Sequence, residues 1–302
     1  MTAPAPRGNL WRALAPMLCL TGAALASPAE AQATVEPARP EQHVGKVVLR
    51  QLVTPDLAVA KRFYGGLLGW TFRDLKLGKA EYAEASMEGQ PVAGLIQRDR
   101  PAGDRFQPAW LTFIAVRDVD AARAVAVEKG ARVLLEPRDV AGRGRQAVLA
   151  DPQGAVFAVL ASSAGDPPDD LPDLGEWIWS SLSTVDPDAD AAFYQAVFDY
   201  QIFELPADAG AQHLLLASDD LARASVNTLP VEARQAHPRW LSYVRVEDVA
   251  WKAALAVSLG GRVLVEPRLD RHGGKVAVVA DPLGAPFGLL EWSDAWTKEV
   301  AK

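Results

Sequence analysis

The side chains that could bind a catalytic metal are few in this chain. The four histidines are His43, His213, His237 and His272. A divalent metal site normally takes three or four nitrogen, oxygen or sulfur ligands from the protein. A histidine site would therefore need several of these residues to meet a carboxylate, such as Glu204 or Glu232. We expect the histidines to occupy turns and surface strand positions instead, and a non-standard metal site in the second half of the chain is the alternative.

Motifs for other common chemistries are missing from the sequence. It contains no Gly-x-Ser-x-Gly elbow, no phosphate-binding loop and no dinucleotide-binding glycine pattern. The run Gly142-Arg143-Gly144-Arg145 has the composition of an anion-binding loop, but we expect a turn with solvated arginines. The glutamates before Pro137 and Pro267 are expected to form surface ion pairs.

Residues that recur at a fixed offset indicate an internal duplication of the chain. An offset of 130 residues relates many aromatic, glycine and proline positions without a gap. The matched pairs are Asp56 and Asp186, Phe63-Tyr64 and Phe193-Tyr194, Trp110 and Trp240, Asp118 and Asp248, Glu136-Pro137-Arg138 and Glu266-Pro267-Arg268, and Asp151-Pro152 and Asp281-Pro282. Solenoid repeats are about 20–50 residues long. The chain therefore consists of two copies of one domain.

The sequence predicts two β-α-β-β-β modules in each copy. Apolar residues at helical spacing predict helices over 57–68 and 118–129, and β-favouring runs between turn residues predict the strands. In the first copy the strands are expected at 47–53, 70–75, 80–87, 92–97, 110–116, 133–135, 146–150 and 155–160. Aspartates before the helices are expected to act as N-caps, and Phe63-Tyr64 and Phe193-Tyr194 are expected to lie in the core.

The ordered motifs resemble the vicinal oxygen chelate superfamily, which includes glyoxalase I, bleomycin-resistance proteins and extradiol dioxygenases. The first module resembles it in Thr54-Pro55-Asp56, Phe63-Tyr64 and Gly69-Trp70, and the second module does so in Trp110, Asp118-Val119 and Asp151-Pro152-Gln153-Gly154. The second copy repeats these motifs. The resemblance covers residues 44–292 and implies an α+β fold in which paired modules form a cup-shaped incomplete barrel that holds the ligand.

The resemblance also implies where a metal would bind, and these positions are apolar. Metal-dependent relatives place a first ligand about seven residues before each helix-opening Asp, and a late Glu about seven residues after the Asp of the Asp-Pro-x-Gly turn. Here these positions hold Leu49, Leu111 and Ala158 in the first copy, and Trp179, Leu241 and Gly288 in the second. We therefore predict no metal at the family's position and no other cofactor.

Strand alternation indicates which residues line the two cups. The candidate ligand-binding residues are Gln51, Tyr82 and Phe113 in the first copy, and Trp179, Ser181, Ser183, Tyr243 and Arg245 in the second. Arginine can bind a carboxylate with two hydrogen bonds, and Trp and Tyr offer flat apolar surfaces. The second cup is the more polar of the two, so we expect ligand binding there. Small barrels are often filled by side chains, which leaves filled cups as an alternative.

The N-terminus predicts export. Arg7 and Arg12 flank an apolar stretch at 13–26, and Ala29-Glu30-Ala31 forms a small-x-small cleavage site. The expected organisation is a signal peptide (1–31), a disordered lead-in (32–43), a first domain (44–161), a linker (162–175) and a second domain (176–302) that ends in a short helix near 294–300. Cleavage would remove Cys19, the one cysteine, and with it any thiol chemistry. The expected location is the periplasm or the extracellular medium.

The composition narrows the classes of partner. The chain is 49% hydrophobic and 23% charged, with a formal net charge of −7. Binding to nucleic acid or to an anionic membrane needs a basic surface, so we expect neither partner after signal cleavage. The sequence predicts a metal-independent protein that binds a small organic ligand. A glyoxalase-type lyase, isomerase or dioxygenase and a structural or interaction protein are the alternatives, and packing of the two copies as an intrachain pseudo-dimer is left open.

Overall fold

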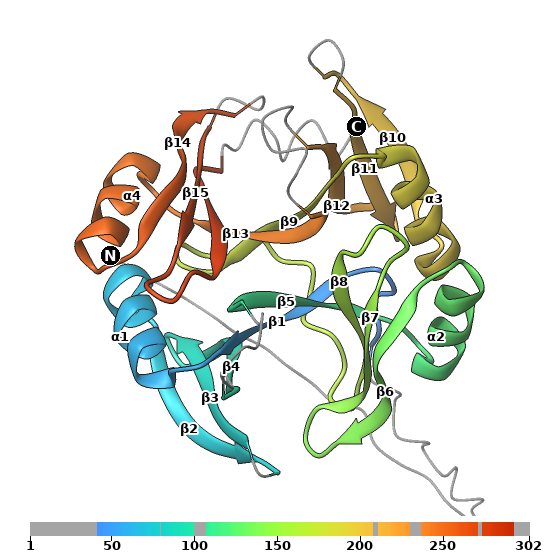
Figure 1. The fold of residues 1–302 in the computed structure, drawn as a ribbon, viewed down its shortest axis with the longest axis horizontal. Helices are drawn as coiled ribbons and strands as arrows, with labels where there is room; N and C mark the ends of the chain where they lie inside the picture. Colours follow the sequence, from blue (N-terminus) through green and yellow to red (C-terminus); the bar gives the residue numbers. More distant parts are fainter. Residues whose placement is uncertain are drawn as a thin grey trace, which may run out of the picture. The chain divides into compact units, whose positions relative to one another are not determined.

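The computed structural model describes residues 41–78, 80–99, 107–207, 211–229, 237–270 and 274–292. The predicted signal peptide, most of the lead-in and the predicted C-terminal helix lie outside these residues. The described part contains one eight-stranded mixed sheet and two helices in each copy (Figure 1). This arrangement confirms the α+β class and the two paired modules in each copy.

The elements follow the same order in both copies. The first copy contains β1 (Val47–Thr54), α1 (Leu57–Leu68), β2 (Thr71–Leu77), β3 (Ala80–Met87), β4 (Gln90–Gln97), β5 (Ala109–Ala115), α2 (Val119–Glu128), β6 (Arg132–Val140), β7 (Gly144–Ala150) and β8 (Val156–Ser162). The second copy contains β9 (Trp177–Thr184), α3 (Pro187–Phe198), β10 (Gln201–Leu205), β11 (His213–Ser218), β12 (Leu221–Thr228), β13 (Arg239–Arg245), α4 (Val249–Ser258), β14 (Arg262–Leu269), β15 (Lys275–Ala280) and β16 (Pro286–Leu290).

The two modules of a copy join through their first strands. The first sheet has the order β2-β3-β4-β1-β5-β8-β7-β6, and β1 pairs with β5 in antiparallel orientation. The second sheet has the equivalent order, with β9 and β13 at its centre. One face of each sheet packs against helices. We call the opposite face of the first sheet, which carries Leu49, Gln51 and Phe113, the first cup face, and the equivalent face of the second sheet the second cup face.

An aspartate starts each helix, as the sequence predicts. Asp56 Oδ1 accepts a hydrogen bond from the backbone N–H of Val59 (2.9 Å), and Asp118, Asp186 and Asp248 cap the other three helices in the same way. An N-cap of this kind satisfies N–H groups that have no partner inside the helix. Helix α1 ends at Gly69, whose φ of 80° is easily adopted only by glycine.

The strand β6 is longer than the predicted 133–135 and includes Pro137. Proline cannot donate a ladder hydrogen bond, so it is tolerated at sheet edges and at bulges. β6 is the edge strand of its sheet, and its register with β7 shifts between Leu135 and Arg138. Glu136 lies 3.2 Å from Arg123 in a surface ion pair, which confirms its predicted role.

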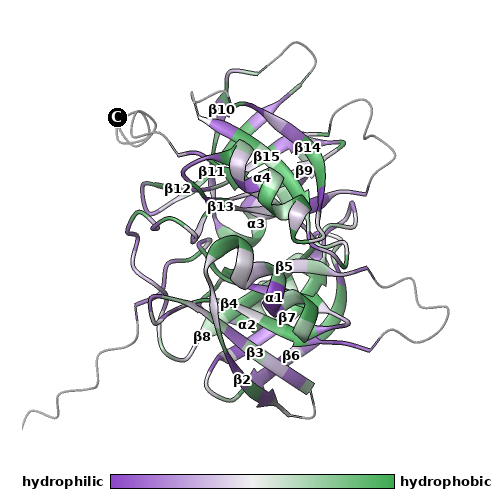
Figure 2. Ribbon diagram, turned by 90° about the vertical axis from the view of Figure 1, so that its left-hand side faces the viewer, coloured by the Kyte–Doolittle hydropathy of each residue, from purple (hydrophilic) through white to green (hydrophobic). Residues whose placement is uncertain are grey.

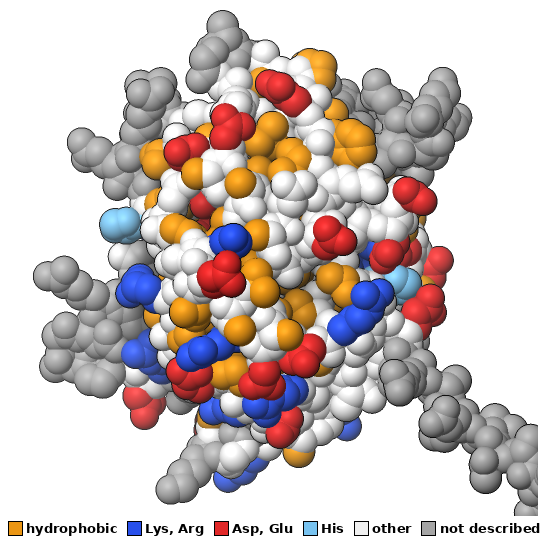
Figure 3. Space-filling view, turned by 90° about the vertical axis from the view of Figure 1, so that its right-hand side faces the viewer, with side chains coloured by type: hydrophobic (Ala, Val, Ile, Leu, Met, Phe, Trp, Pro, Cys, Tyr) orange, Lys and Arg blue, Asp and Glu red, His pale blue; other side chains and the backbone are white. Residues whose placement is uncertain are grey.

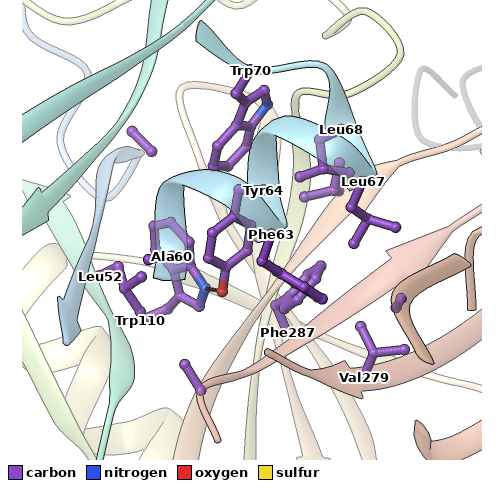
Figure 4. Close-up of a cluster of buried hydrophobic side chains, with 14 of the residues drawn as sticks. Leu52, Ala60, Phe63, Tyr64, Leu67, Leu68, Trp70, Trp110, Val279 and Phe287 are labelled. Carbon is purple, nitrogen blue, oxygen red and sulfur yellow. Dashed lines mark hydrogen bonds between the residues drawn. The ribbon is translucent and has the colours of Figure 1, made fainter. Parts of the chain in front are cut away.

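The hydrophobic cores combine residues of both copies. In one core, Phe63 and Tyr64 on α1 pack against Phe287 on β16 of the second copy (Figure 4). The second core is equivalent and places Phe193 and Tyr194 on α3 against Phe157 on β8. The predicted core positions of both Phe-Tyr pairs are confirmed. Hydrophobic residues are prominent on β15 and α4, as Figure 2 shows by colour.

Two matching polar relays cross these cores. Trp110 Nε1 donates to the Tyr64 hydroxyl (2.9 Å), which donates to Asp281 Oδ2 in the other copy (3.2 Å). Trp240, Tyr194 and Asp151 repeat the relay with distances of 2.8 and 3.0 Å. Buried polar groups are tolerated when they are hydrogen-bonded. The Asp-Pro-x-Gly turns therefore also hold the two copies together.

The surface carries charges of both signs. On the face formed by α2 and α3, acidic and basic side chains are interspersed, and no extended region of one sign occurs among the described residues there (Figure 3). The described part contains no helix long and apolar enough to cross a membrane.

Candidate functional site

The family's metal positions meet on the first cup face, and they form an apolar cluster. Phe113 pairs with Leu49 on β1 and with Ala158 on β8. Leu111 packs in the same cluster, in which Phe113 and Ala158 are fully buried. None of these side chains offers a nitrogen or oxygen donor, so the residues present do not fit a divalent metal ion.

On the second cup face, the expected metal-ligand positions Trp179 and Gly288 lie against an aromatic ring. Tyr243 on β13 pairs with Trp179 on β9 and with Gly288 on β16. A Cβ atom at Gly288 would overlap the Tyr243 ring, so the absence of a side chain there makes room for the tyrosine. The late ligand position of this copy is therefore filled by an aromatic ring.

The histidines do not create a metal site elsewhere in the described part of the chain. His43 lies 3.7 Å from Asp169 in an ion-pair network near the linker. His213 pairs with Leu205, whereas Glu204 pairs with Leu214, so His213 and Glu204 face opposite sides of their sheet. Among the described residues, no group of three or more His, Cys, Asp or Glu side chains could hold a metal. His272 and Glu232 lie outside these residues.

An arginine that we expected to be solvated lies on the first cup face. Arg143 Nη1 donates to Gln51 Oε1 (2.8 Å) and Gln146 Oε1 (3.3 Å), and its Nη2 donates to the Tyr82 hydroxyl (2.9 Å). The guanidinium carbon lies 5.3 Å from the centre of the Tyr82 ring and 5.7 Å from that of Phe113. The structure thus brings together Gln51, Tyr82 and Phe113, the three candidate residues of this copy, around Arg143.

The turn before β7 explains why Arg143 points inward. Gly142 and Gly144 flank it with φ angles of 73° and 119°, which other residues rarely adopt. A Cβ atom at Gly144 would overlap the carbonyl oxygen of Ala161, so only glycine allows this close approach to β8. Arg145, two residues on, lies outside and pairs with Asp120 (2.5 Å). The prediction of two solvated arginines was therefore wrong for Arg143.

The charge of Arg143 has no carboxylate partner among the described residues. Its hydrogen-bond acceptors are two amides and a phenol, and all three are neutral. Glu84, the acidic residue on the neighbouring strand, pairs with Arg73 (2.9 Å). Burial raises the pKa of Tyr82, and Arg143 only partly offsets this effect. Tyr82 therefore stays protonated at neutral pH, and Arg143 with its three hydrogen-bond acceptors carries one net positive charge.

The candidate residues of the second copy do not converge on one group, although Ser181 and Tyr243 bind each other. Trp179 Nε1 donates to Ser225 Oγ (3.1 Å), and the Ser181 hydroxyl donates to Tyr243 (3.3 Å). Ser183 pairs with Arg239 and Asn227 on the adjacent strands. Arg245 donates to the carbonyl oxygen of Pro172 in the linker (2.8 Å) and is not directed at the other candidates.

The copies differ at every polar position around Arg143. The residues 130 positions later are Ser181 for Gln51, Gln212 for Tyr82, Gly273 for Arg143 and Val276 for Gln146. At the position equivalent to Arg143, the second copy therefore has a glycine and no guanidinium. A comparison of the two turns would have found this asymmetry in the sequence, because Gly142-Arg143-Gly144 aligns with His272-Gly273-Gly274.

Comparisons with known proteins agree with the duplicated fold. Residues 42–159 match the model of the Glyoxalase/Bleomycin resistance protein/Dioxygenase superfamily, and residues 179–290 match that of the Glyoxalase-like domain. A relative from Mycobacterium tuberculosis, "Putative glyoxylase CFP32", is 32% identical over 84% of this chain and 98% of its own length. The anthracycline biosynthesis protein DauV from Streptomyces sp. is 32% identical over 81% of this chain and 92% of its own.

Solved structures share the fold at lower identity. A Mn(II)-bound glyoxalase from Novosphingobium aromaticivorans superimposes with a TM-score of 0.58 at 18% identity, over 83% of each chain. A homoprotocatechuate 2,3-dioxygenase variant from B. fuscum gives a TM-score of 0.60 at 15% identity, over 85% of this chain and 73% of its own.

Proposed function

Because this chain belongs to the glyoxalase, bleomycin resistance protein and dioxygenase superfamily, we propose that it binds a small organic acid on its first cup face without a metal ion. The observation that carries the proposal is the Arg143 guanidinium, which lies on the first cup face beside Phe113 and has only neutral partners. A cation enclosed by neutral groups favours an anionic ligand, because burial of an unpaired charge is unfavourable.

The groups around Arg143 suit an aromatic carboxylate. A guanidinium can donate two parallel hydrogen bonds to a carboxylate, each stronger than a bond between neutral groups. Tyr82 keeps its proton and can also donate to the ligand, while Phe113 adds an aromatic surface. The name of one relative refers to anthracyclines, which are aromatic compounds, and this supports an aromatic ligand.

A glyoxalase-type enzyme is the second candidate function, and the names of the relative from M. tuberculosis and of the Mn(II)-bound structure favour it. This function would require metal ligands at a site other than the apolar cluster around Phe113. A third candidate is a structural protein with filled cups, which the complete burial of Phe113 favours.

The binding proposal is tested with benzoate and its neutral analogue benzamide, using isothermal titration calorimetry. We expect the wild type to prefer benzoate, and Arg143→Met to lower benzoate affinity by about tenfold or more, as for a lost charge-assisted bond. Arg145→Met is the matched control, because it removes a guanidinium from the same turn at an exposed ion pair. Equal benzoate affinity in both variants, or a stoichiometric tightly bound metal in the purified protein, would contradict the proposal.

We also propose that the protein is exported. The basic residues Arg7 and Arg12, the apolar stretch at 13–26 and the small residues at 29–31 support this proposal. N-terminal sequencing of protein from the periplasm or culture medium should find a start near residue 32. Full-length protein confined to the cytoplasm would refute export and leave the binding proposal unaffected.

A further inference from the structure

We infer that a second ligand site lies between the two copies, for a molecule with an aromatic body and an acidic group. A cavity of about 930 Å³ is bordered by the starts of β1 and β9, by Gln90–Val92 and Asp220–Ala222, and by linker residues 167–173. Most of its walls are equivalent between the copies: Lys46 and Glu176, Val47 and Trp177, Val48 and Ile178, Pro91 and Leu221. Binding pockets for drug-sized ligands have volumes of about 300–1,000 Å³. None of the residues around Arg143 lines this cavity, so it is separate from the first cup face.

Arg50 supplies the positive charge of this site. Its Nη1 donates to the carbonyl oxygen of Val47 and its Nη2 to the Ser180 hydroxyl, both at 3.2 Å. Residues 50 and 180 are equivalent positions, so Arg50 crosses the boundary at which the two copies meet. Burial lowers the pKa of Arg50 to about 9, and no carboxylate among the described residues pairs with it.

Two buried donors beside the cavity have no acceptor. Arg50 Nε and Trp177 Nε1 are both buried without a hydrogen-bond partner in the described part of the chain. The guanidinium of Arg50 lies 5.9 Å from the centre of the Trp177 ring, and Trp177 is only 6% exposed. Unpaired buried donors are rare in proteins, because each loses its hydrogen bonds to water. A carboxylate or sulfonate in the cavity would neutralise the charge of Arg50, and it would satisfy these donors once the two side chains turn toward it.

The other cations of the cavity are already neutralised. Lys46 Nζ and Arg223 Nη1 both lie 2.6 Å from Asp169 Oδ1. Arg223 is also 3.4 Å from Asp219. Arg50 is therefore the cation of the cavity that lacks a charged partner among the described residues, which makes it the anchor for an anion.

The remaining walls fit a flat apolar body. Trp177, Trp179 and Trp292 line the cavity, together with Val47, Val48, Val92, Ile178 and Leu221. The linker forms a fixed wall, because Lys46 donates to the carbonyl oxygens of Pro167 and Pro168 (2.6 and 2.7 Å). At the other end of the linker, Trp70 Nε1 donates to Gly175 O (2.8 Å). An aromatic ligand can thus enter a preformed site, which lowers the entropic cost of binding.

The test compares 1-naphthaleneacetate with its neutral amide by titration calorimetry on the purified full chain. We expect the wild type to bind the acid at least about ten times more tightly than the amide, as for a charge-assisted bond. Arg50→Met should abolish this preference and keep the affinity for the amide, whereas Arg143→Met should retain the preference. Trp177→Phe, which removes one donor and keeps a ring, should weaken acid binding by a few fold.

Three results would overturn the inference. In the first, the wild type binds neither probe. In the second, Arg50→Met keeps the full preference for the acid. In the third, Arg143→Met loses this preference instead. The last result would assign the probe to the first cup face. Circular dichroism checks the fold of each variant, and Trp177→Phe keeps the test decisive if Arg50→Met does not fold. A failure of the benzoate experiment at Arg143 does not affect this test, because the two sites share no residue.

Discussion

The buried carboxylate of Asp190 predicts how the stability of the protein depends on pH. It lies on α3 with 1% of its surface exposed, and its Oδ2 has no hydrogen-bond partner among the described residues. Burial raises its pKa to about 7, and the nearby carboxylates of Asp151 and Asp186 contribute to this rise. The equivalent residue of the first copy is Ala60, so the fold does not require a carboxylate at this position. We predict that Asp190→Asn stabilises the protein at alkaline pH.

The raised pKa of Asp190 determines how its contribution to stability changes with pH. The folded state binds the proton of Asp190 more tightly than the unfolded state, whose pKa is near the ordinary 3.8. The associated stability is complete below pH 4 and is lost as the pH rises through about 7. The full difference in pKa corresponds to about 4 kcal/mol, at 1.36 kcal/mol per unit. Relaxation of the protein around the ionised carboxylate reduces the expected gain to about 1–2 kcal/mol at pH 8.5.

Urea denaturation at pH 8.5, 6.0 and 4.5 measures this gain as a difference in the free energy of unfolding. The advantage of Asp190→Asn should be largest at pH 8.5 and should shrink toward pH 4.5. The control is Asp188→Asn, which removes an exposed carboxylate from the same helix turn. An Asp190→Asn protein that is less stable than the wild type at pH 8.5, or a gain that does not change with pH, would refute the reasoning.

Two further predictions concern packing, and both are measured by denaturation. Tyr64→Phe removes the hydroxyl that links Trp110 to Asp281. It should lower the free energy of unfolding by about 1–3 kcal/mol, because two buried polar groups lose their partner. An unchanged stability would show that the relay does not hold the copies together. Gly94→Ala places a Cβ atom against the Tyr82 hydroxyl and should cost about 1–3 kcal/mol through overpacking. The double variant Gly94→Ala/Tyr82→Phe should recover part of this loss, and no recovery would contradict the contact.

The regular elements were predictable because their signals are local. Helix α1 has the bounds that its spacing predicts, since Asp56 and Gly69 mark its two ends. Strand β6 was underestimated, because Pro137 suggests the end of a strand and only the sheet order shows that it lies at an edge. The residues of the first cup face followed from strand alternation, which placed Gln51 and Phe113 on one face.

The features that depend on contacts between distant segments were not predictable. Arg143 reaches the cup face through a turn whose course depends on the approach of Gly144 to Ala161. The Asp-Pro-x-Gly motifs indicate turns, but the bonds of their aspartates to tyrosines of the other copy appear only in three dimensions. The sequence favoured the second cup as the more polar of the two, but Arg245, the cation among its candidate residues, binds the linker.

The central claim is that Arg143, and not a metal ion, anchors the ligand on the first cup face. The most direct measurement is the benzoate affinity of the wild-type protein before and after dialysis against EDTA. We predict the same affinity in both samples, because Leu49, Leu111 and Ala158 offer no ligands to a metal. Affinity that is lost after EDTA and restored by Mn²⁺, Fe²⁺, Ni²⁺ or Zn²⁺ would contradict the account.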